Sequence, residues 1–179
     1  KLPFTKSQIE KIAKKYPTPF YIYDEIAIRK NASRLLQAFS WAPGFKNFFA
    51  VKVTPNPSII KIFREEGMGT DCASHPELVL SQKLGIVGED IMFSSNDTPY
   101  EEFKKAFDLG AIINLDDVTH IPILEKYAAI PKVICFRYNP GPMRKYRGNF
   151  IIGDPSEAKY GLTKEQLFDA YKIMKNKGV

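Results

Sequence analysis

One lysine lies inside an otherwise apolar run. Residues 48–53 are FFAVKV, and Lys52 carries the single charge among them. Such a run predicts a parallel strand buried on both faces, where an ammonium group is costly unless it is paired or covalently modified. A desolvated amine is also a good nucleophile toward a carbonyl carbon. The alternative is a lysine at a strand end whose amine reaches water, and the residues alone leave both open.

Two more charged residues occupy strand-like segments. Arg137 interrupts the segment CFRY, and Asp71 lies in the segment MGTDCA. A guanidinium keeps its charge and donates in a fixed fork, which suits a phenolate or phosphate oxygen. A carboxylate on a neighbouring strand would be placed to pair with a cation at the same edge. The alternatives are a structural ion pair for Arg137 and a helix cap beside Asp71, because Ser74 and Glu77 have the capping-box spacing.

The elements that must position these residues alternate along the chain. Strands are expected at 48–53, 68–73, 91–93, 112–115 and 133–138. Helices are expected at 57–66, 76–84, 100–109, 118–127 and 164–177. Glycines follow four of these helices, where a left-handed cap favours them, at Gly67, Gly85, Gly110 and Gly178. The alternation predicts an α/β fold with a parallel sheet covered by helices.

Two parallel architectures fit this alternation, an open doubly wound sheet and a (β/α)8 barrel. No GxGxxG fingerprint follows the first long strand, so nothing favours a dinucleotide-binding sheet. In a barrel, active residues lie where the strands end. That rule selects Lys52, Asp71, Ser74, Ser95, Asn96, Asp116, Asp117, Arg137 and Asn139. The segment 142–158 is long for a connection, which makes it a candidate for substrate contacts.

A short helix and a short strand are expected ahead of the alternation. Either Thr5 with Gln8 or Ser7 with Glu10 gives the spacing of a capping box for the helix. Residues 19–23 are rich in aromatic and β-branched side chains, which predicts a strand. Asp24 is then expected to cap a helix that runs to about residue 39.

The composition limits the partners. The formal net charge is +6, but basic residues are interleaved with acidic ones, so we expect no nucleic-acid partner. No apolar segment is long enough for a membrane span. His75 and His120 stand in no metal-binding spacing, so no metal is expected. Cys72 and Cys135 lie in strand-like segments without a disulfide pattern, which favours a reducing, cytoplasmic location.

Seven short motifs occur in the order found in the ornithine and diaminopimelate decarboxylases. They are residues 17–24 (PTPFYIYD), 49–52 (FAVK), 69–74 (GTDCAS, followed by Glu77-Leu78), 93–96 (FSSN), 114–117 (NLDD), 136–140 (FRYNP) and 159–162 (KYGL). The chain therefore resembles the N-terminal portion of this family, whose barrel is of the alanine-racemase type. The resemblance implies a partial (β/α)8 TIM-type barrel, with about five of eight strands. We divide the chain into an N-terminal helix and strand, 1–23, and an incomplete cofactor-binding barrel domain, 24–179.

The resemblance implies roles for individual residues. Lys52 would be catalytic and would form the Schiff base with pyridoxal 5′-phosphate. Ala50 would line this cofactor, Asp71 would lie near Lys52 with Lys159 as a candidate partner, and Arg137 would lie near the phenolic oxygen of the ring. The cofactor would act as an electron sink when the substrate loses its α-carboxylate.

The resemblance also implies an activity, the decarboxylation of an amino acid by a homodimer. Asn139-Pro140 and the opening motif favour meso-diaminopimelate, which would give lysine. The motif GTDCAS favours ornithine, so an ornithine- or arginine-type enzyme is one alternative. A non-catalytic pyridoxal-phosphate-binding or regulatory homologue is the other, although the single-domain binding proteins usually carry serine where this chain has Val51.

Several parts of the family's site lie beyond residue 179. They are a histidine stacked on the ring, a glycine-rich phosphate segment, a glutamate for the pyridine nitrogen and a C-terminal β-domain with a catalytic cysteine. We therefore expect this chain to be an N-terminal fragment that is inactive by itself.

Overall fold

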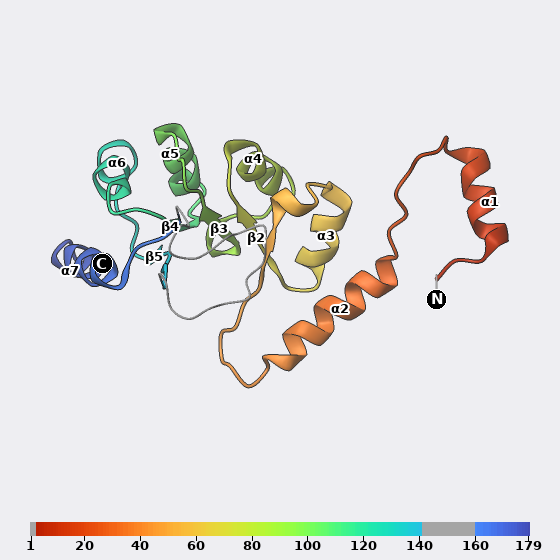
Figure 1. Cartoon of the computed structure of the whole chain (residues 1–179), viewed down its shortest axis with the longest axis horizontal. Helices are drawn as coiled ribbons and strands as arrows, with labels where there is room; N and C mark the ends of the chain where they lie inside the picture. Colours follow the sequence, from red (N-terminus) through yellow and green to blue (C-terminus); the bar gives the residue numbers. More distant parts are fainter. Residues whose placement is uncertain (1–2, 141–159) are drawn as a thin grey trace. The chain divides into compact units, whose positions relative to one another are not determined.

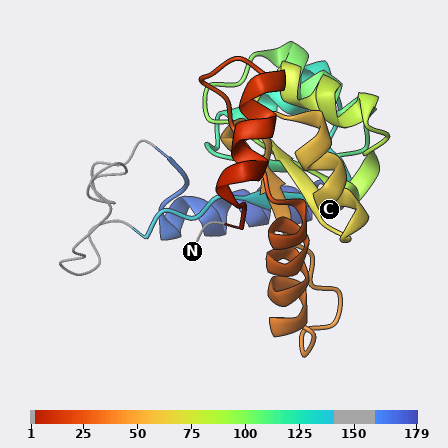
Figure 2. The same ribbon diagram turned by 90° about the vertical axis from the view of Figure 1, so that its right-hand side faces the viewer.

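The structure, a computed structural model, describes residues 3–140 and 160–179. The chain divides into two compact units, Lys1–Phe45 and Lys46–Val179, whose elements are labelled in Figure 1. The first unit holds helices α1 (Lys6–Lys15) and α2 (Glu25–Ala38), drawn in red and orange in Figure 2. No helix in these described ranges is long and apolar enough to cross a membrane.

The helix caps of the first unit agree with those predicted from the sequence. Thr5 and Gln8 form the capping box of α1, with the Thr5 N–H donating to Gln8 Oε1 at 2.8 Å. Asp24 Oδ1 accepts from the Ala27 N–H at 3.0 Å, so the predicted helix start is confirmed. The strand expected at residues 19–23 is wrong, because that segment is assigned no strand. Aromatic and β-branched residues favour extended backbone, but a strand also needs a partner for its ladder.

The second unit alternates strands and helices in the predicted order. The strands are β1 (Phe48–Ala50), β2 (Gly69–Cys72), β3 (Ile91–Ser94), β4 (Ile112–Leu115) and β5 (Ile134–Phe136). The helices are α3 (Pro57–Glu65), α4 (His75–Lys83), α5 (Tyr100–Asp108), α6 (His120–Tyr127) and α7 (Lys164–Asn176). Short 3-10 helices are η1 (Val51–Val53) and η2 (Gly88–Asp90). Positive φ at Gly67, Gly85, Gly110 and Gly178 confirms the predicted helix ends.

The strands lie in the sheet in the same order as in the sequence. All neighbouring strands are parallel, and their order is β1-β2-β3-β4-β5. A doubly wound sheet reverses its order at a switch point, whereas a barrel adds each new strand to the same edge. Helices α3, α4, α5 and α6 lie in a row along one side of these strands (Figure 1). The fold is therefore α/β, part of a (β/α)8-type barrel with five of its strands.

The helix-covered face of the sheet carries the core. Phe93 of β3 meets the ring of Phe103 of α5 edge to face, with centroids 6.1 Å apart. Phe49 of β1 stacks on Phe63 of α3 at 4.3 Å. Polar groups on this face are also paired, since the buried Ser81 hydroxyl of α4 donates to Thr70 Oγ1 at 3.1 Å. This face therefore holds the helices on the sheet.

The other face is the inward face of the barrel. Because side chains alternate along a strand, the residues between the core positions point to this face. They are Phe48, Ala50, Gly69, Asp71, Met92, Ser94, Ile112, Asn114 and Cys135. The Phe48 ring crosses Gly69 so closely that a Cβ there would lie 2.6 Å from Phe48 Cδ1. The glycine thus makes room for the ring, and polar side chains begin just beyond it.

Removing one outer-face ring tests this division of the sheet. We expect Phe93→Ala to lower the free energy of unfolding by about 3–5 kcal/mol, because Phe93 is 1% exposed and its loss leaves a cavity. Denaturant unfolding followed by circular dichroism measures the change. The same substitution at Phe168 of α7, which is 60% exposed, should cost less than about 1 kcal/mol. Equal losses at both positions would contradict the assigned core.

Candidate functional site

Lys52 lies at the carboxyl end of β1, in η1. The strand ends at Ala50, which pairs with Asp71 of β2. Val51 takes the buried position at 0% exposure, and the 3-10 turn leaves Lys52 exposed. The expected strand through residue 53 is therefore wrong, and of the two alternatives for Lys52 the structure has the lysine at a strand end with an exposed side chain. The short strand ends before Lys52, and the turn carries the side chain to an accessible position.

Asp71 combines partial burial with nearby positive charge. Burial raises the pKa of the Asp71 carboxyl above its ordinary value. The nearby Ser94 hydroxyl and the charges of Lys52 and Arg137 act in the opposite direction on this pKa. Asp71 Oδ1 is buried and accepts no hydrogen bond from the described residues. The carboxylate therefore has an unused buried oxygen and cations from two other strand ends around it.

Arg137, directly after β5, is held by a buried carboxylate. Its Nη1 lies 2.9 Å from Oδ1 of Asp116, whose side chain is 4% exposed. This distance makes an ion pair, although its angles do not make it a hydrogen bond. The structural ion pair considered from the sequence is thus present. A guanidinium carries five N–H donors, so pairing through Nη1 leaves others for a second acceptor.

A later segment packs against Arg137. The Leu162 N–H donates to the Arg137 carbonyl at 2.8 Å, and the Asn139 N–H donates to the Leu162 carbonyl at 2.8 Å. Gly161, which precedes Leu162, has φ +87°, and a Cβ at this position would lie 3.0 Å from the carbonyl oxygen of Arg137. The Tyr160 ring centroid lies 5.9 Å from the guanidinium carbon. Lys159, the candidate partner of Asp71, and the segment 142–158 lie outside the described residues.

Two other carboxylates near this edge serve local structure. Glu77 accepts from the Ala73 N–H and from the Ser74 hydroxyl, each at 3.0 Å, so it caps the start of α4. Asp117 Oδ1 accepts from the Thr119 N–H at 2.8 Å, and these contacts with Thr119 lower the pKa of the Asp117 carboxyl. The helix-cap alternative therefore describes Glu77, whereas Asp117 stabilises the turn before α6.

His120 lies near the carboxylates of Asp116 and Asp117. His120 of α6 is buried and packs edge to face on Phe103, with centroids 5.4 Å apart. Burial lowers the pKa of the His120 imidazole. Nowhere in the described part of the chain do three or more His, Cys, Asp or Glu side chains gather as metal ligands would.

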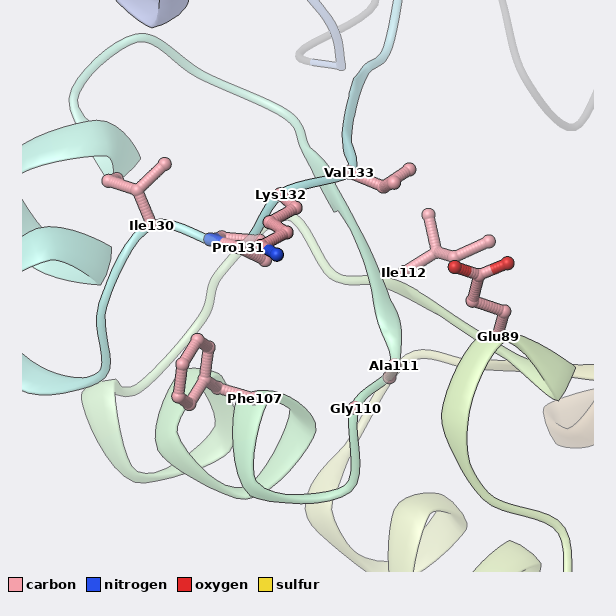
Figure 3. Close-up of a pocket in the computed structure, with 9 residues that line it drawn as sticks. All are labelled: Glu89, Phe107, Gly110, Ala111, Ile112, Ile130, Pro131, Lys132 and Val133. Atoms are coloured by element: carbon pink, nitrogen blue, oxygen red, sulfur yellow. The ribbon is translucent and has the colours of Figure 1, made fainter. Parts of the chain in front are cut away.

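A cavity of about 340 Å³ opens at the opposite edge of the sheet (Figure 3). Its lining comes from η2, the end of α5, the start of β4 and the loop before β5, and comprises Glu89, Phe107, Gly110, Ala111, Ile112, Ile130, Pro131, Lys132 and Val133. These residues lie at the amino ends of the strands, away from Lys52, Asp71 and Arg137. In a barrel this edge serves stability, so the cavity is not the candidate site.

The structure adds two residues that the list of strand ends lacks. Asn114 Nδ2 donates to Ser94 Oγ at 3.2 Å, and both side chains lie on the inward face. Half-buried polar residues alternate there with the buried core residues Phe93, Ile113 and Leu115. The two-residue period was the signal that would have found them.

The raised pKa of Asp71 predicts how stability depends on pH. Folding raises the pKa of the Asp71 carboxyl, so the folded state favours the protonated form. The free energy of unfolding therefore falls as pH rises from the unfolded-state pKa through the folded-state pKa. We expect Asp71→Asn to raise the free energy of unfolding at pH 7. The gain should vanish near pH 3. This pH lies below the pKa of an aspartate in the unfolded chain, about 3.9, so the wild-type carboxyl is mostly protonated in both states. Chemical denaturation at the two pH values measures it, and a loss of stability at pH 7 would contradict the assignment.

Comparison with known proteins covers almost the whole chain. The family described as pyridoxal-dependent decarboxylase, pyridoxal binding domain, matches residues 25–178. Protein TabA of Pseudomonas amygdali pv. tabaci is 35% identical over 170 residues, which cover 95% of this chain and 39% of that protein. A diaminopimelate decarboxylase of Thermoplasma acidophilum is 33% identical over 172 residues, which cover 96% of this chain and 41% of that protein.

A solved structure shows the same fold. The crystal structure of diaminopimelate decarboxylase from M. jannaschi matches with a TM-score of 0.80 at 24% identity, over 91% of this chain and 40% of that chain. The chain spans about two fifths of the length of the curated relatives it matches.

Proposed function

The chain belongs to the pyridoxal-dependent decarboxylase family, within its pyridoxal-binding domain, and we propose that the protein carrying it decarboxylates meso-diaminopimelate to lysine. The observation that carries this proposal is the meeting of Lys52, Asp71 and Arg137 at one edge of a family-matched barrel. Active residues of such barrels lie at this edge. The matched diaminopimelate decarboxylases and the motif at Asn139-Pro140 support the choice of substrate.

The described residues fit pyridoxal phosphate, the cofactor of this family. Asp71 Oδ1 is a buried oxygen without a hydrogen-bond partner in the described ranges, which suits a positively charged nitrogen. Lys52 is exposed, so its amine is accessible to an aldehyde. Ala50, across from Asp71, has a small side chain that leaves room on the inward face.

We assign each residue a role on these grounds. Lys52 is the catalytic residue that holds the cofactor, and Ala50 lines it. Asp71 would place negative charge beside the Lys52 nitrogen, and Arg137 would donate to the phenolic oxygen of the bound cofactor. The cofactor, when bound, withdraws the electron pair left on the α-carbon as carbon dioxide departs.

Further assignments concern the whole protein. We propose that its barrel domain begins at residue 24, which the family match from residue 25 supports. We also propose a homodimer that binds an amino-acid substrate in a reducing, cytoplasmic location. The free thiols of Cys72 and Cys135 support that location. An ornithine- or arginine-type enzyme is kept as the second candidate, because GTDCAS resembles the ornithine decarboxylases.

Labelling tests the role of Lys52. We expect borohydride reduction of the full-length protein with pyridoxal phosphate to attach the cofactor to Lys52, as measured by peptide mass spectrometry. Lys52→Ala should abolish the labelling. Lys61→Ala should leave it unchanged, because Lys61 lies on the solvent side of α3 with a side chain 68% exposed. Attachment at another lysine would refute the assignment.

Turnover tests the activity and the substrate. We expect the full-length protein to release carbon dioxide from meso-diaminopimelate faster than from ornithine or arginine. We expect a protein limited to these 179 residues to give no turnover, since it spans about two fifths of its relatives. Carbon dioxide release from each substrate measures both. Preference for ornithine would shift the assignment to the second candidate, and turnover by the 179 residues would refute the expected inactivity.

A further inference from the structure

A row of polar side chains crosses the inward face of the sheet. Asp71 of β2, Ser94 of β3 and Asn114 of β4 occupy neighbouring positions, with Ser94 paired in register with Asn114. The interiors of such barrels are usually filled by branched apolar residues. A polar group placed there costs free energy unless it is hydrogen-bonded. The contacts within the row therefore call for a physical explanation.

The first link of the row sets the direction of the Ser94 hydroxyl. Asn114 Nδ2 donates to Ser94 Oγ at 3.2 Å, so the serine oxygen acts as the acceptor. A serine hydroxyl has one proton to donate, and that proton remains available for another acceptor. Because Asn114 donates to the Ser94 oxygen, the Ser94 hydroxyl is left to act as a donor to another group.

The second link reaches Asp71. Asp71 pairs with Met92 in register, so Ser94 lies one inward-facing position further toward the carboxyl edge. The Ser94 hydroxyl lies close enough to the Asp71 carboxyl to lower its pKa against the effect of burial. Asp71 Oδ1 stays without a hydrogen-bond partner among the described residues. This buried oxygen is therefore left for a positive charge.

We propose that Ser94, oriented by Asn114, is a positioning residue that fixes the Asp71 carboxylate toward Lys52. The proposal rests on the function proposed above and adds residues that act through Asp71. A fixed carboxylate loses less conformational entropy when the cofactor binds, because its rotamer is already set. Ser94 and Asn114 thereby tune the site although neither is assigned a contact with the cofactor.

The test separates positioning from general stability. Four variants of the full-length protein are compared: Ser94→Ala, Asn114→Ala, the conservative Ser94→Thr, and the control Ser81→Ala. Ser81 is also buried and hydrogen-bonded, but it faces the outer side of β2. The Asp71 carboxyl is titrated by carbon-13 NMR without the cofactor, and binding of pyridoxal phosphate is measured by its absorbance.

Ser94→Ala and Asn114→Ala should raise the pKa of Asp71, because each weakens the donor to its carboxylate. Both should weaken binding of pyridoxal phosphate about threefold to tenfold, the loss expected from one hydrogen bond. Ser94→Thr keeps the hydroxyl and should restore both values. Ser81→Ala should lower stability and leave the Asp71 titration unchanged. If Ser94→Ala does not fold, Asn114→Ala tests the same row.

An unchanged Asp71 titration in Ser94→Ala or, where that variant does not fold, in Asn114→Ala would overturn the proposal. An equal change in Ser81→Ala would overturn it too. These outcomes are distinct from failure of the proposed function. If the titration moves but Lys52 takes no label, the positioning stands and the function fails. If the titration is unchanged while the protein decarboxylates its substrate, the function stands and the positioning fails.

Discussion

Side chains point alternately to the two faces of a strand, and this alternation divides each strand of the sheet between two tasks. In β3 and β4 the buried residues Phe93, Ile113 and Leu115 face the helices. Their neighbours Ser94 and Asn114 face inward and bond to each other. A shift of one residue in any strand would exchange the two sets, so packing of the outer face fixes which polar groups meet inside.

The strand ends add charge to this polar face. Parallel strands bring all their carboxyl ends to one edge, where Lys52 follows β1 and Arg137 follows β5. Asp71 lies between them on β2, half-buried, with its charge opposed by burial and favoured by both cations. Asp116 forms an ion pair with Arg137, and Asp116 Oδ2 also accepts from the Gly161 N–H at 3.3 Å. The edge thus joins residues that are distant along the chain.

Carboxylates at the same edge differ in what they contact. Glu77 and Asp117 are occupied by nearby backbone N–H groups, so they stabilise helix starts and turns. Asp71 has a buried oxygen with no hydrogen bond from the described residues, and this makes it the carboxylate available to a ligand. Asp71 and Asp117 lie at or just after strand ends, and Glu77 lies in the first turn of α4. The local hydrogen bonds, which depend on the turn after each strand, separate them.

The sequence by itself determined the order of elements in the second unit, the glycine helix ends, and the family, because apolar periodicity and short ordered motifs are local. It placed Lys52, Asp71 and Arg137 at one edge, since parallel strands share their ends. It failed at residues 19–23 and at the end of the first strand, which depend on ladder partners and on where β1 stops, and it left the burial of Lys52 open. Only the tertiary structure decided that Asp116 pairs with Arg137 and that Ser94 bonds to Asn114. Strand register sets those contacts, and register follows from packing of the whole sheet.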